Sequence, residues 1–533
     1  MNIMARSAIL ILIALLSLSF LWKRDRAEPA AANDGGSEAV VDETAPPTFA
    51  SGVASLVYGN CTPCHHDGGS GPFPLVDYAQ IKRRAKQIAI VTETRFMPPW
   101  KPAPDFGDFH DVRRLEEDEI AMLTAWAEAG APLGDEASVP PTPTFEHEWL
   151  LGEPDEVLSM TETYVVPAEG KDDYRSFVIP SGWTEERYVR AFDFRPDNPP
   201  PVHHIITLVD DGGWARRFDQ ESPDIVGLEG MVAEGELFGT EIHGWGPGGT
   251  PRFLPEGSAW KLPANTDFVL DTHFQTTGRE EPVQISIGVY YADEVPEAPM
   301  ANLSLSATLL CIPPEKDDYM VDYSFELPTD VEVVSIQPHA HYLGTDIRVV
   351  AKTPEGKTVP LIHIPDWDFS WQDNYRYVEP FALPAKTRIE MSFRFDNTST
   401  NDRNPFSPPR RIISGPRWSD EMALLWVQVA VKPENKALLT KTVVDYNDHV
   451  LEVSAPFIAL FNGVIHGFDA DKNLMLDAEE DALATAYMNA LPDHPHAAVF
   501  DADQNGVIEG EEREFLEAAI AMWNGERPLA NPH

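Results

Sequence analysis

The stretch Cys61-Thr62-Pro63-Cys64-His65 brings two thiols and an imidazole together. Two cysteines at this spacing can each bond one vinyl group of the same haem, and the histidine that follows can then ligate its iron. A zinc site would need a second Cys/His pair at zinc spacing, and the remaining cysteine, Cys311, has no such partner. We therefore interpret the stretch as the attachment site of one covalent haem c.

A haem held in this way needs a ligand on its other side. Met97, in the segment Phe96-Met97-Pro98-Pro99-Trp100, is our candidate, because a thioether sulfur favours reduced iron and raises its potential. A methionine that fills a gap in the core is the alternative interpretation. The place of Met97, between the cysteine motif and a helical pattern at 116–127, favours the ligand role.

A group of histidines, with one methionine, recurs in the middle of the chain. Its members are His203, His204, His273, His339, His341 and Met422. Residues i and i+2 of a strand point to the same face, so His339 and His341 can chelate one ion. Adjacent residues point to opposite faces, so His203 and His204 can share a metal only at a bulge or a strand end. Three imidazoles suit copper or zinc, whereas two imidazoles and a thioether select copper, because soft sulfur favours Cu(I).

Two acidic stretches near the end of the sequence match the twelve-residue calcium loop, with oxygen ligands at positions 1, 3, 5, 9 and 12. These positions hold Asp469, Asp471, Asn473, Asp477 and Glu480 in the first loop, and Asp501, Asp503, Asn505, Glu509 and Glu512 in the second. Two copies between helical runs predict an EF-hand pair with up to two structural calcium ions; acidic loops without metal are the alternative. Position 6 favours glycine at its sharp turn. It holds Gly506 in the second loop but Leu474 in the first, so we expect the second to bind more tightly.

The length and patterning of the chain indicate how these segments are organised. At 533 residues the chain exceeds a single core. Short runs of β-type residues between Pro- and Gly-rich turns, from about 145 to 455, predict two antiparallel sandwiches. Apolar residues at helical spacing predict helices at 116–127 and from Pro456 onward. The expected parts are 1–26, a signal peptide or anchor; 27–47, a flexible tether; 48–137, a haem domain; 145–296 and 297–455, the two sandwiches; and 456–533, the EF-hand pair.

Charge and the N-terminus indicate the compartment. The net charge of −46 argues against nucleic acid and against anionic membrane surfaces. A basic start at Met1–Arg6 precedes an apolar run, Ser7–Trp22, that is shorter than the roughly 20 residues of a membrane-spanning helix. This pattern favours a signal peptide, although the basic cluster Lys23–Arg26 leaves a retained anchor open. Since c-type haem is attached outside the bacterial cytoplasm, we expect an exported protein, periplasmic or extracellular.

The ordered set His-His, His, His-x-His and Met resembles the type II copper, ascorbate-dependent monooxygenases, the family of peptidylglycine α-hydroxylating monooxygenase and dopamine β-monooxygenase. The resemblance covers roughly 145–455 and includes Leu254-Pro255-Glu256-Gly257 and Ser419-Asp420-Glu421-Met422. It implies two jelly-roll domains with one copper ion each. By resemblance, His203, His204 and His273 hold the electron-transfer copper. His339, His341 and Met422 would hold the copper where O2 binds and a C–H bond is hydroxylated. Residues 48–137 resemble a small class I cytochrome c.

Departures from the family pattern bear on the substrate. The peptide-amidating branch binds its substrate's carboxylate with an Arg before the His-x-His motif and with an Asn and a Tyr after the ligand Met. Those positions hold Gln337, Leu424 and Trp426, none of which pairs with a carboxylate as Arg does. The family's disulfides are missing too. A peptide C-terminus is therefore not expected, and Leu424 and Trp426 suit something more apolar.

The resemblance thus implies a copper monooxygenase that hydroxylates an unknown small or apolar substrate with O2. Its two electrons would come from an external donor, a small reductant or a redox protein, through the fused haem. The alternative is a haem and copper protein that relays electrons or binds copper without hydroxylation. A blue-copper reductase is a weaker alternative, since it needs a Cys ligand near a His and no His closely follows Cys311.

Overall fold

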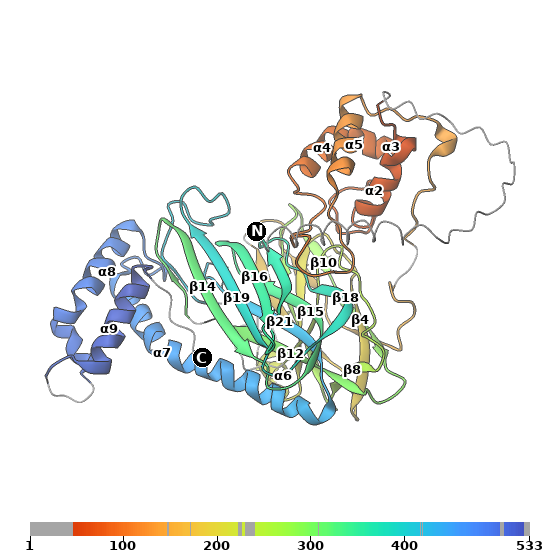
Figure 1. The fold of residues 1–533 in the computed structure, drawn as a ribbon. Helices are drawn as coiled ribbons and strands as arrows, with labels where there is room; N and C mark the ends of the chain where they lie inside the picture. Colours follow the sequence, from red (N-terminus) through yellow and green to blue (C-terminus); the bar gives the residue numbers. More distant parts are fainter. Residues whose placement is uncertain are drawn as a thin grey trace, which may run out of the picture. The chain divides into compact units, whose positions relative to one another are not determined.

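The computed structural model describes residues 46–145, 149–170, 172–221, 226–229, 240–307, 309–415, 417, 419–501 and 506–526. The expected signal peptide or anchor and nearly all of the expected tether lie outside this range, as do Asp503 and Asn505 of the second acidic loop. The chain divides into two units, Met1–Pro46 and Pro47–His533. The second unit is multidomain, with antiparallel β-sheets between two helical regions (Figure 1).

The first helical region follows the expected pattern. It comprises η1 (Phe49–Val53), α2 (Ala54–Asn60), α3 (Tyr78–Arg83), α4 (Ala85–Glu93), α5 (Glu117–Glu128) and η2 (Glu136–Ser138). Helix α5 confirms the helix predicted over 116–127, and Glu116 and Glu119 cap its start reciprocally. The core of this helical region includes Phe49 and Trp126, whose ring centroids lie 6.1 Å apart. The cysteine motif therefore sits on a small helical scaffold of its own.

The segment 99–114, between α4 and α5, leaves this scaffold and joins the second β-sandwich. Phe109 forms an antiparallel bridge with Tyr377 and is buried in the core of that sandwich. The backbone N–H of Ala103 donates to His363 O at 2.8 Å. The first helical region is thus tied to the β-strands by main-chain bonds as well as by side chains.

The first β-sandwich is built from the strands between residues 156 and 291. They are β1 (Glu156–Ser159), β2 (Tyr164–Val166), β3 (Asp173–Pro180), β4 (Arg187–Pro196), β5 (Val202–Asp210), β6 (Leu228–Glu229), β7 (Thr240–Trp245), β8 (Ser258–Leu262), β9 (Asp267–Phe274), β10 (Glu281–Val283) and β11 (Ile285–Tyr291), with α6 (Trp214–Glu221) after β5. Strands β6-β3-β9-β5-β7 form one sheet and β1-β11-β4-β8 belong to the other. Alternate residues of both sheets, such as Phe177 and Ile287, fill the core between them.

The second β-sandwich uses the strands from residue 298 to residue 430. They are β12 (Ala298–Ser306), β13 (Cys311–Ile312), β14 (Lys316–Glu326), β15 (Val331–His339), β16 (Gly344–Lys352), β17 (Thr358–Ile364), β18 (Tyr375–Leu383), β19 (Arg388–Asn397), β20 (Ile412–Ile413) and β21 (Leu424–Ala430). The sheet β14-β19-β16-β17 faces the strands β12-β21-β15-β18 across a buried core.

The two sandwiches share a sheet rather than meeting at a free joint. Strand β8 of the first pairs in parallel with β12 of the second, Ser258 opposite Ala298, which makes one eight-stranded sheet across both. The sequence placed the boundary at 296/297, just before β12. Because backbone hydrogen bonds cross that boundary, the two sandwiches are held in a fixed relation to each other.

The C-terminal region begins earlier than the sequence pattern indicated. Helix α7 spans Pro433–Phe468, so it starts well before Pro456 and replaces the last expected β residues. Pro433 occupies the first turn, where its missing N–H costs no helical hydrogen bond. The helix is followed by α8 (Ala478–Ala490), η4 (Leu491–Asp493), η5 (Pro495–Phe500) and α9 (Gly510–Trp523). By length and composition α7 could cross a membrane, but Tyr446 Oη also donates to Ser306 O at 3.0 Å, so it packs on β12.

Candidate functional site

The cysteine motif lies at the C-terminal end of α2. Cys61 and Cys64 are both free thiols, and the backbone N–H of His65 donates to Cys61 O at 2.9 Å. This single turn places both thiols and the imidazole on one short loop. Such an arrangement is what two thioether bonds to one haem would need.

The His65 ring is held in one orientation. Its Nδ1 lies 2.9 Å from Phe73 O, so Nδ1 carries the proton and Nε2 keeps its lone pair for a metal. A Cβ on Gly71 would lie 2.6 Å from this Nδ1, so only glycine allows the approach. Burial lowers the pKa of His65, which keeps the ring neutral. These features fit a haem ligand. Met97, the candidate for the opposite side, lies just after α4, where its N–H donates to Val91 O.

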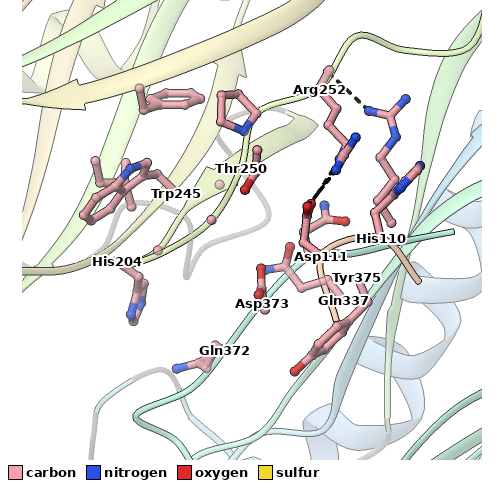
Figure 2. A pocket seen from close by; sticks show the side chains of 18 of the residues that line it. His110, Asp111, His204, Trp245, Thr250, Arg252, Gln337, Gln372, Asp373 and Tyr375 are labelled. Carbon is pink, nitrogen blue, oxygen red and sulfur yellow. Dashed lines mark hydrogen bonds and ion pairs between the residues drawn. The ribbon is translucent and has the colours of Figure 1, made fainter. Parts of the chain in front are cut away.

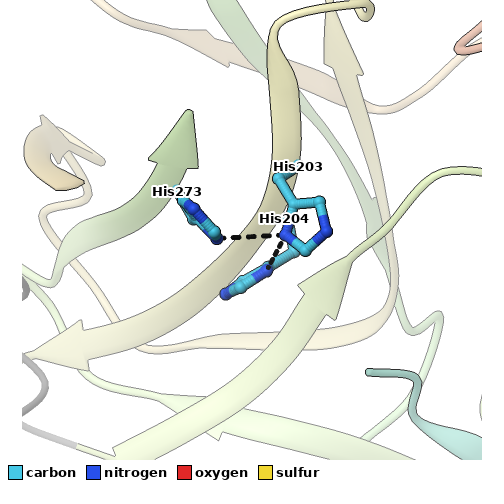
Figure 3. A group of neighbouring side chains, drawn as sticks. All are labelled: His203, His204 and His273. Carbon is cyan, nitrogen blue, oxygen red and sulfur yellow. Dashed lines mark hydrogen bonds between the residues drawn. The ribbon is translucent and has the colours of Figure 1, made fainter. Parts of the chain in front are cut away.

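The first histidine group, His203, His204 and His273, converges on one point (Figure 3). The Nδ1 atom of His203 lies 3.0 Å from the Nδ1 atoms of both His204 and His273. One ligand nitrogen from each of the three rings falls within 4.8 Å of the others, close enough to hold one metal ion.

A local irregularity of β5 makes this convergence possible. His204 pairs with His273 across β5 and β9, and the pairing shifts register between Val202 and His204. A bulge turns one of two neighbouring side chains toward the other's face. The bulge that the sequence analysis required for His203 and His204 to share a metal is therefore present.

Two of these rings also form a hydrogen bond on the edge that points away from the other histidines. His273 Nε2 lies 2.9 Å from Asp172 Oδ2, and His203 makes a hydrogen bond to the Ser370 backbone. A neutral imidazole that donates a hydrogen bond from one ring nitrogen has a lone pair on the other, here the nitrogen that faces the other histidines. Burial lowers the pKa of His203 to about 4 and that of His204 well below its usual value, so these two rings are neutral. Lone pairs that face one another at 3.0 Å suit a cation between them.

Removing the Asp172 carboxylate is expected to weaken metal binding at the first histidine group. Asp172→Ala should lower copper affinity about 10- to 100-fold, the usual effect of losing the hydrogen-bond partner of a ligand histidine. The measurement is a competitive copper titration. Glu169→Ala is the matched control, because it removes an exposed carboxylate three positions away. An affinity equal in both variants would contradict the role of Asp172.

The second histidine group, His339 and His341, lies at the end of β15. The two ring centroids are 5.2 Å apart. His339 Nδ1 bonds to Gln372 Oε1, and His341 Nδ1 lies 3.0 Å from Asp420 O. Both rings therefore keep Nε2 for a metal. Burial lowers the pKa of His339 to about 4 and that of His341 to about 3.

A buried carboxylate ties this group to Met422. Glu421 Oε1 accepts the backbone N–H groups of His341 and Met422, and its Oε2 accepts that of Leu343 at 2.9 Å. The side chain is fully buried, and burial raises its pKa to about 8. Glu421 thus holds the backbones of His341 and Met422 side by side.

A single aromatic ring separates the two histidine groups. The centroid of Phe369 lies 6.1 Å from that of His273 and 5.4 Å from that of His341. The ring is 5% exposed, and Tyr342 packs against it at 4.5 Å. His273 and His341 are therefore no further apart than the sum of these two centroid separations.

A pocket of about 90 Å³, lined by polar and apolar side chains in similar measure, opens beside the first histidine group (Figure 2). His204 and Trp245 line it from the first sandwich, and Gln337 and Gln372 line it from the second. The segment 99–114 closes another side, where Asp111 pairs with Arg252 through two hydrogen bonds. The pocket holds a few water molecules or a small polar group.

The two acidic loops share their local geometry. Leu474 N–H donates to Asp469 Oδ2 at 2.8 Å, and Gly506 N–H donates to Asp501 Oδ2 at 2.7 Å. Both sixth positions have positive φ, 66° for Leu474 and 85° for Gly506, so the conformational cost expected at Leu474 is present.

Further predicted ligands of these loops cap the helices that follow. Asp477 and Glu480 cap α8, and Glu509 and Glu512 cap α9 in the same reciprocal way. Asp469, Asp471 and Glu480 offer oxygens within 4.8 Å of one another, which could hold a metal. Asn473 Nδ2 donates to Asp471 Oδ2 at 2.7 Å.

The sequence did not single out four supporting residues of the site: Asp172, Phe369, Gln372 and Glu421. Each contacts a partner that is distant in the sequence. The shortest of these separations is 28 residues, between Phe369 and His341. Only Glu421 carried a local signal, since it is a charged residue directly before Met422.

No protein-family model and no curated protein matches the chain. Solved structures with some likeness include one of infectious bursal disease virus Gx strain, at 8% identity over 56% of this chain and 77% of that one, with a TM-score of 0.17. A recombinant peptide:N-glycanase F matches at 11% identity over 52% and 96%, with a TM-score of 0.22. The major capsid protein P2 from bacteriophage PM2 matches at 6% identity over 46% and 99%, with a TM-score of 0.19. Likeness at this level supports no inference about family or function.

Proposed function

We propose that this protein is a copper-dependent monooxygenase that hydroxylates a C–H bond of a small apolar substrate with O2. The observation that carries the proposal is the pair of buried histidine groups on either side of Phe369, with ligand nitrogens freed by hydrogen bonds on the opposite ring edges. In this proposal the β region is a pair of jelly rolls related to the type II copper monooxygenases. Residues 48–137 are a cytochrome c domain, and the C-terminal region is an EF-hand pair.

The donor sets suggest different tasks for the two groups. His203, His204 and His273 would hold a copper ion that stores one electron. His339, His341 and Met422 would hold a copper ion that, when reduced, supplies the site for O2 activation, since a thioether favours Cu(I). Asp172, Gln372 and Asp420 keep the ligand rings in one tautomer, and Phe369 packs against His273 and His341.

The substrate side of the second group is apolar. On β15 and β21, His339 lies opposite Leu424 and Gln337 lies opposite Trp426, so these side chains share one sheet face. The Trp426 ring centroid is 5.6 Å from that of His339. A small apolar substrate could rest against Leu424 and Trp426, neither of which carries a charge to bind a carboxylate.

The haem would supply single electrons at a stable potential. Cys61 and Cys64 would hold it, with His65 as the proximal ligand and Met97 opposite. An external donor, either a small reductant or a redox protein, would reduce it. Because c-type haem is attached outside the bacterial cytoplasm, we also propose that the protein is exported, with the N-terminus as a signal peptide or anchor.

Calcium is proposed to order the C-terminal helices. Glu480→Gln should weaken calcium binding at the first loop by about tenfold or more, because that loop position supplies a bidentate carboxylate. Calorimetry on the full chain measures the change. Glu479→Gln is the matched control, since it removes the neighbouring charge from a position that is not a ligand. Equal calcium affinity in both variants would contradict an EF-hand role for the first loop.

Metal and haem analysis of the full chain tests the proposal. We expect one haem that acid–acetone cannot extract, and two copper ions per chain. His273→Ala and His341→Ala should each remove one copper ion. Two copper ions with no O2-dependent product would favour an electron relay instead, and a chain without copper would contradict the proposal.

A further inference from the structure

Arg113, in the segment 99–114, reaches three parts of the chain at once. Its Nε donates to Pro99 O at 3.2 Å and its Nη1 to Gly248 O at 2.7 Å. Its Nη2 donates to Asp373 Oδ2 at 2.8 Å. Pro99 is the first residue of the same segment, Gly248 lies in the loop after β7, and Asp373 precedes β18. One guanidinium thus joins the first helical region to both sandwiches.

The loop that Arg113 holds also touches the cysteine motif. A Cβ on Gly248 would lie 2.7 Å from Cys64 Sγ and 3.4 Å from Arg113 Nη1. Gly248 has a φ of 79°, in the left-handed region. The absence of a side chain therefore lets the loop lie directly against the thiol that would carry the haem.

The other side of this loop faces the first histidine group. Gly246 and Pro247 line a small pocket together with His203, His204 and Trp100. Arg113 lines the same pocket, with its guanidinium carbon 5.8 Å from the Trp100 ring centroid. A single short loop, 246–248, therefore lies against Cys64 at one end and lines the pocket of His203 and His204 at the other.

We propose that Arg113 and Gly248 dock the haem-bearing segment on the first histidine group and fix the path for electrons between the two redox sites. Arg113 acts as a positioning residue. The inference rests on the proposed function for its redox step. In that step ferrous haem becomes ferric and one Cu(II) of the same chain becomes Cu(I), with no transfer of atoms. An external reductant, dithionite in the test, supplies the electron.

Three variants of the full chain test the docking. Gly248→Ala inserts a methyl group against Cys64 Sγ, and Arg113→Gln removes the charge and most of the donors. Gly278→Ala is the control, because Gly278 has a similar φ of 86° and its Cβ would meet nothing within 4 Å. Hydrogen–deuterium exchange reports the contact itself at 61–71 and 246–250. Anaerobic stopped-flow absorbance of the haem reports electron transfer to copper.

We expect faster exchange at both segments in Gly248→Ala and Arg113→Gln. Their intramolecular electron transfer should be about tenfold or more slower, since small displacements of reacting groups have effects of this size, with the haem spectrum unchanged. Gly278→Ala should behave as the parent chain. Unchanged exchange in both variants would refute the docking, and faster exchange with an unchanged rate would refute its role in electron transfer. A parent chain without haem or copper would refute the proposed function, while the exchange results still decide the docking.

Discussion

Replacing Met422 by leucine is expected to abolish O2-dependent product formation while leaving the first histidine group and the haem intact. Leucine keeps the volume but removes the thioether, so the second group loses its preference for Cu(I). We expect product formation to fall more than about 100-fold, because losing even the hydrogen-bond partner of a metal ligand lowers metal affinity or activity 10- to 100-fold. X-ray absorption of the reduced, copper-loaded chain should lose its sulfur contribution in the same variant.

Two results separate this effect from general damage. The Met422→Leu chain should still take up two copper ions, and its haem should be reduced by dithionite as in the parent. Met320→Leu is a matched control, because Met320 is an exposed methionine on β14, outside both histidine groups. A parent-like sulfur signal and full product formation in Met422→Leu would show that this thioether is not a ligand.

Replacing Arg411 by alanine is expected to destabilise the protein strongly. Arg411 Nε donates to Asp481 Oδ1 at 2.6 Å, and its Nη1 donates to Trp523 O. Its side chain is only 2% exposed. Removing one partner of a buried ion pair leaves an uncompensated charge, so the free energy of unfolding should fall by about 3–5 kcal/mol.

The contact matters because it joins β20 of the second sandwich to α8 and α9. Denaturation with guanidinium, followed by circular dichroism, measures the loss. Lys441→Ala is the control, since Lys441 pairs with Asp445 on an exposed face of α7. Exposed pairs of this kind contribute roughly 0.3–0.5 kcal/mol. Similar unfolding midpoints for the two variants would contradict a structural role for Arg411.

Part of the site could be predicted because its signals are local. The spacing of the cysteine motif and of the two acidic loops needs only a few consecutive residues. The requirement for a bulge at His203 and His204 follows from strand geometry alone, and the register shift beside His204 satisfies it. The strain at Leu474 was equally local, because it depends on one position of a turn.

The remaining features depend on contacts between distant segments. Phe369 and Glu421 act across the fold, and nothing in their neighbourhood along the chain indicates which histidines they meet. The segment 99–114 has no strand pattern, yet Phe109 pairs with Tyr377 because the second core accepts its ring. The early start of α7 at Pro433 was missed because a proline inside a helical pattern usually ends the helix, yet Pro456 lies within α7.

Labelling with ¹⁸O₂ tests the central claim most directly. The full chain, loaded with copper and reduced with ascorbate, is incubated under ¹⁸O₂ with a mixture of small apolar compounds, and the products are analysed by mass spectrometry. The account predicts a hydroxylated product that carries one ¹⁸O atom, and its loss in His339→Ala. A product whose new oxygen comes from water, or no product from a chain that holds two copper ions and reducible haem, would contradict it.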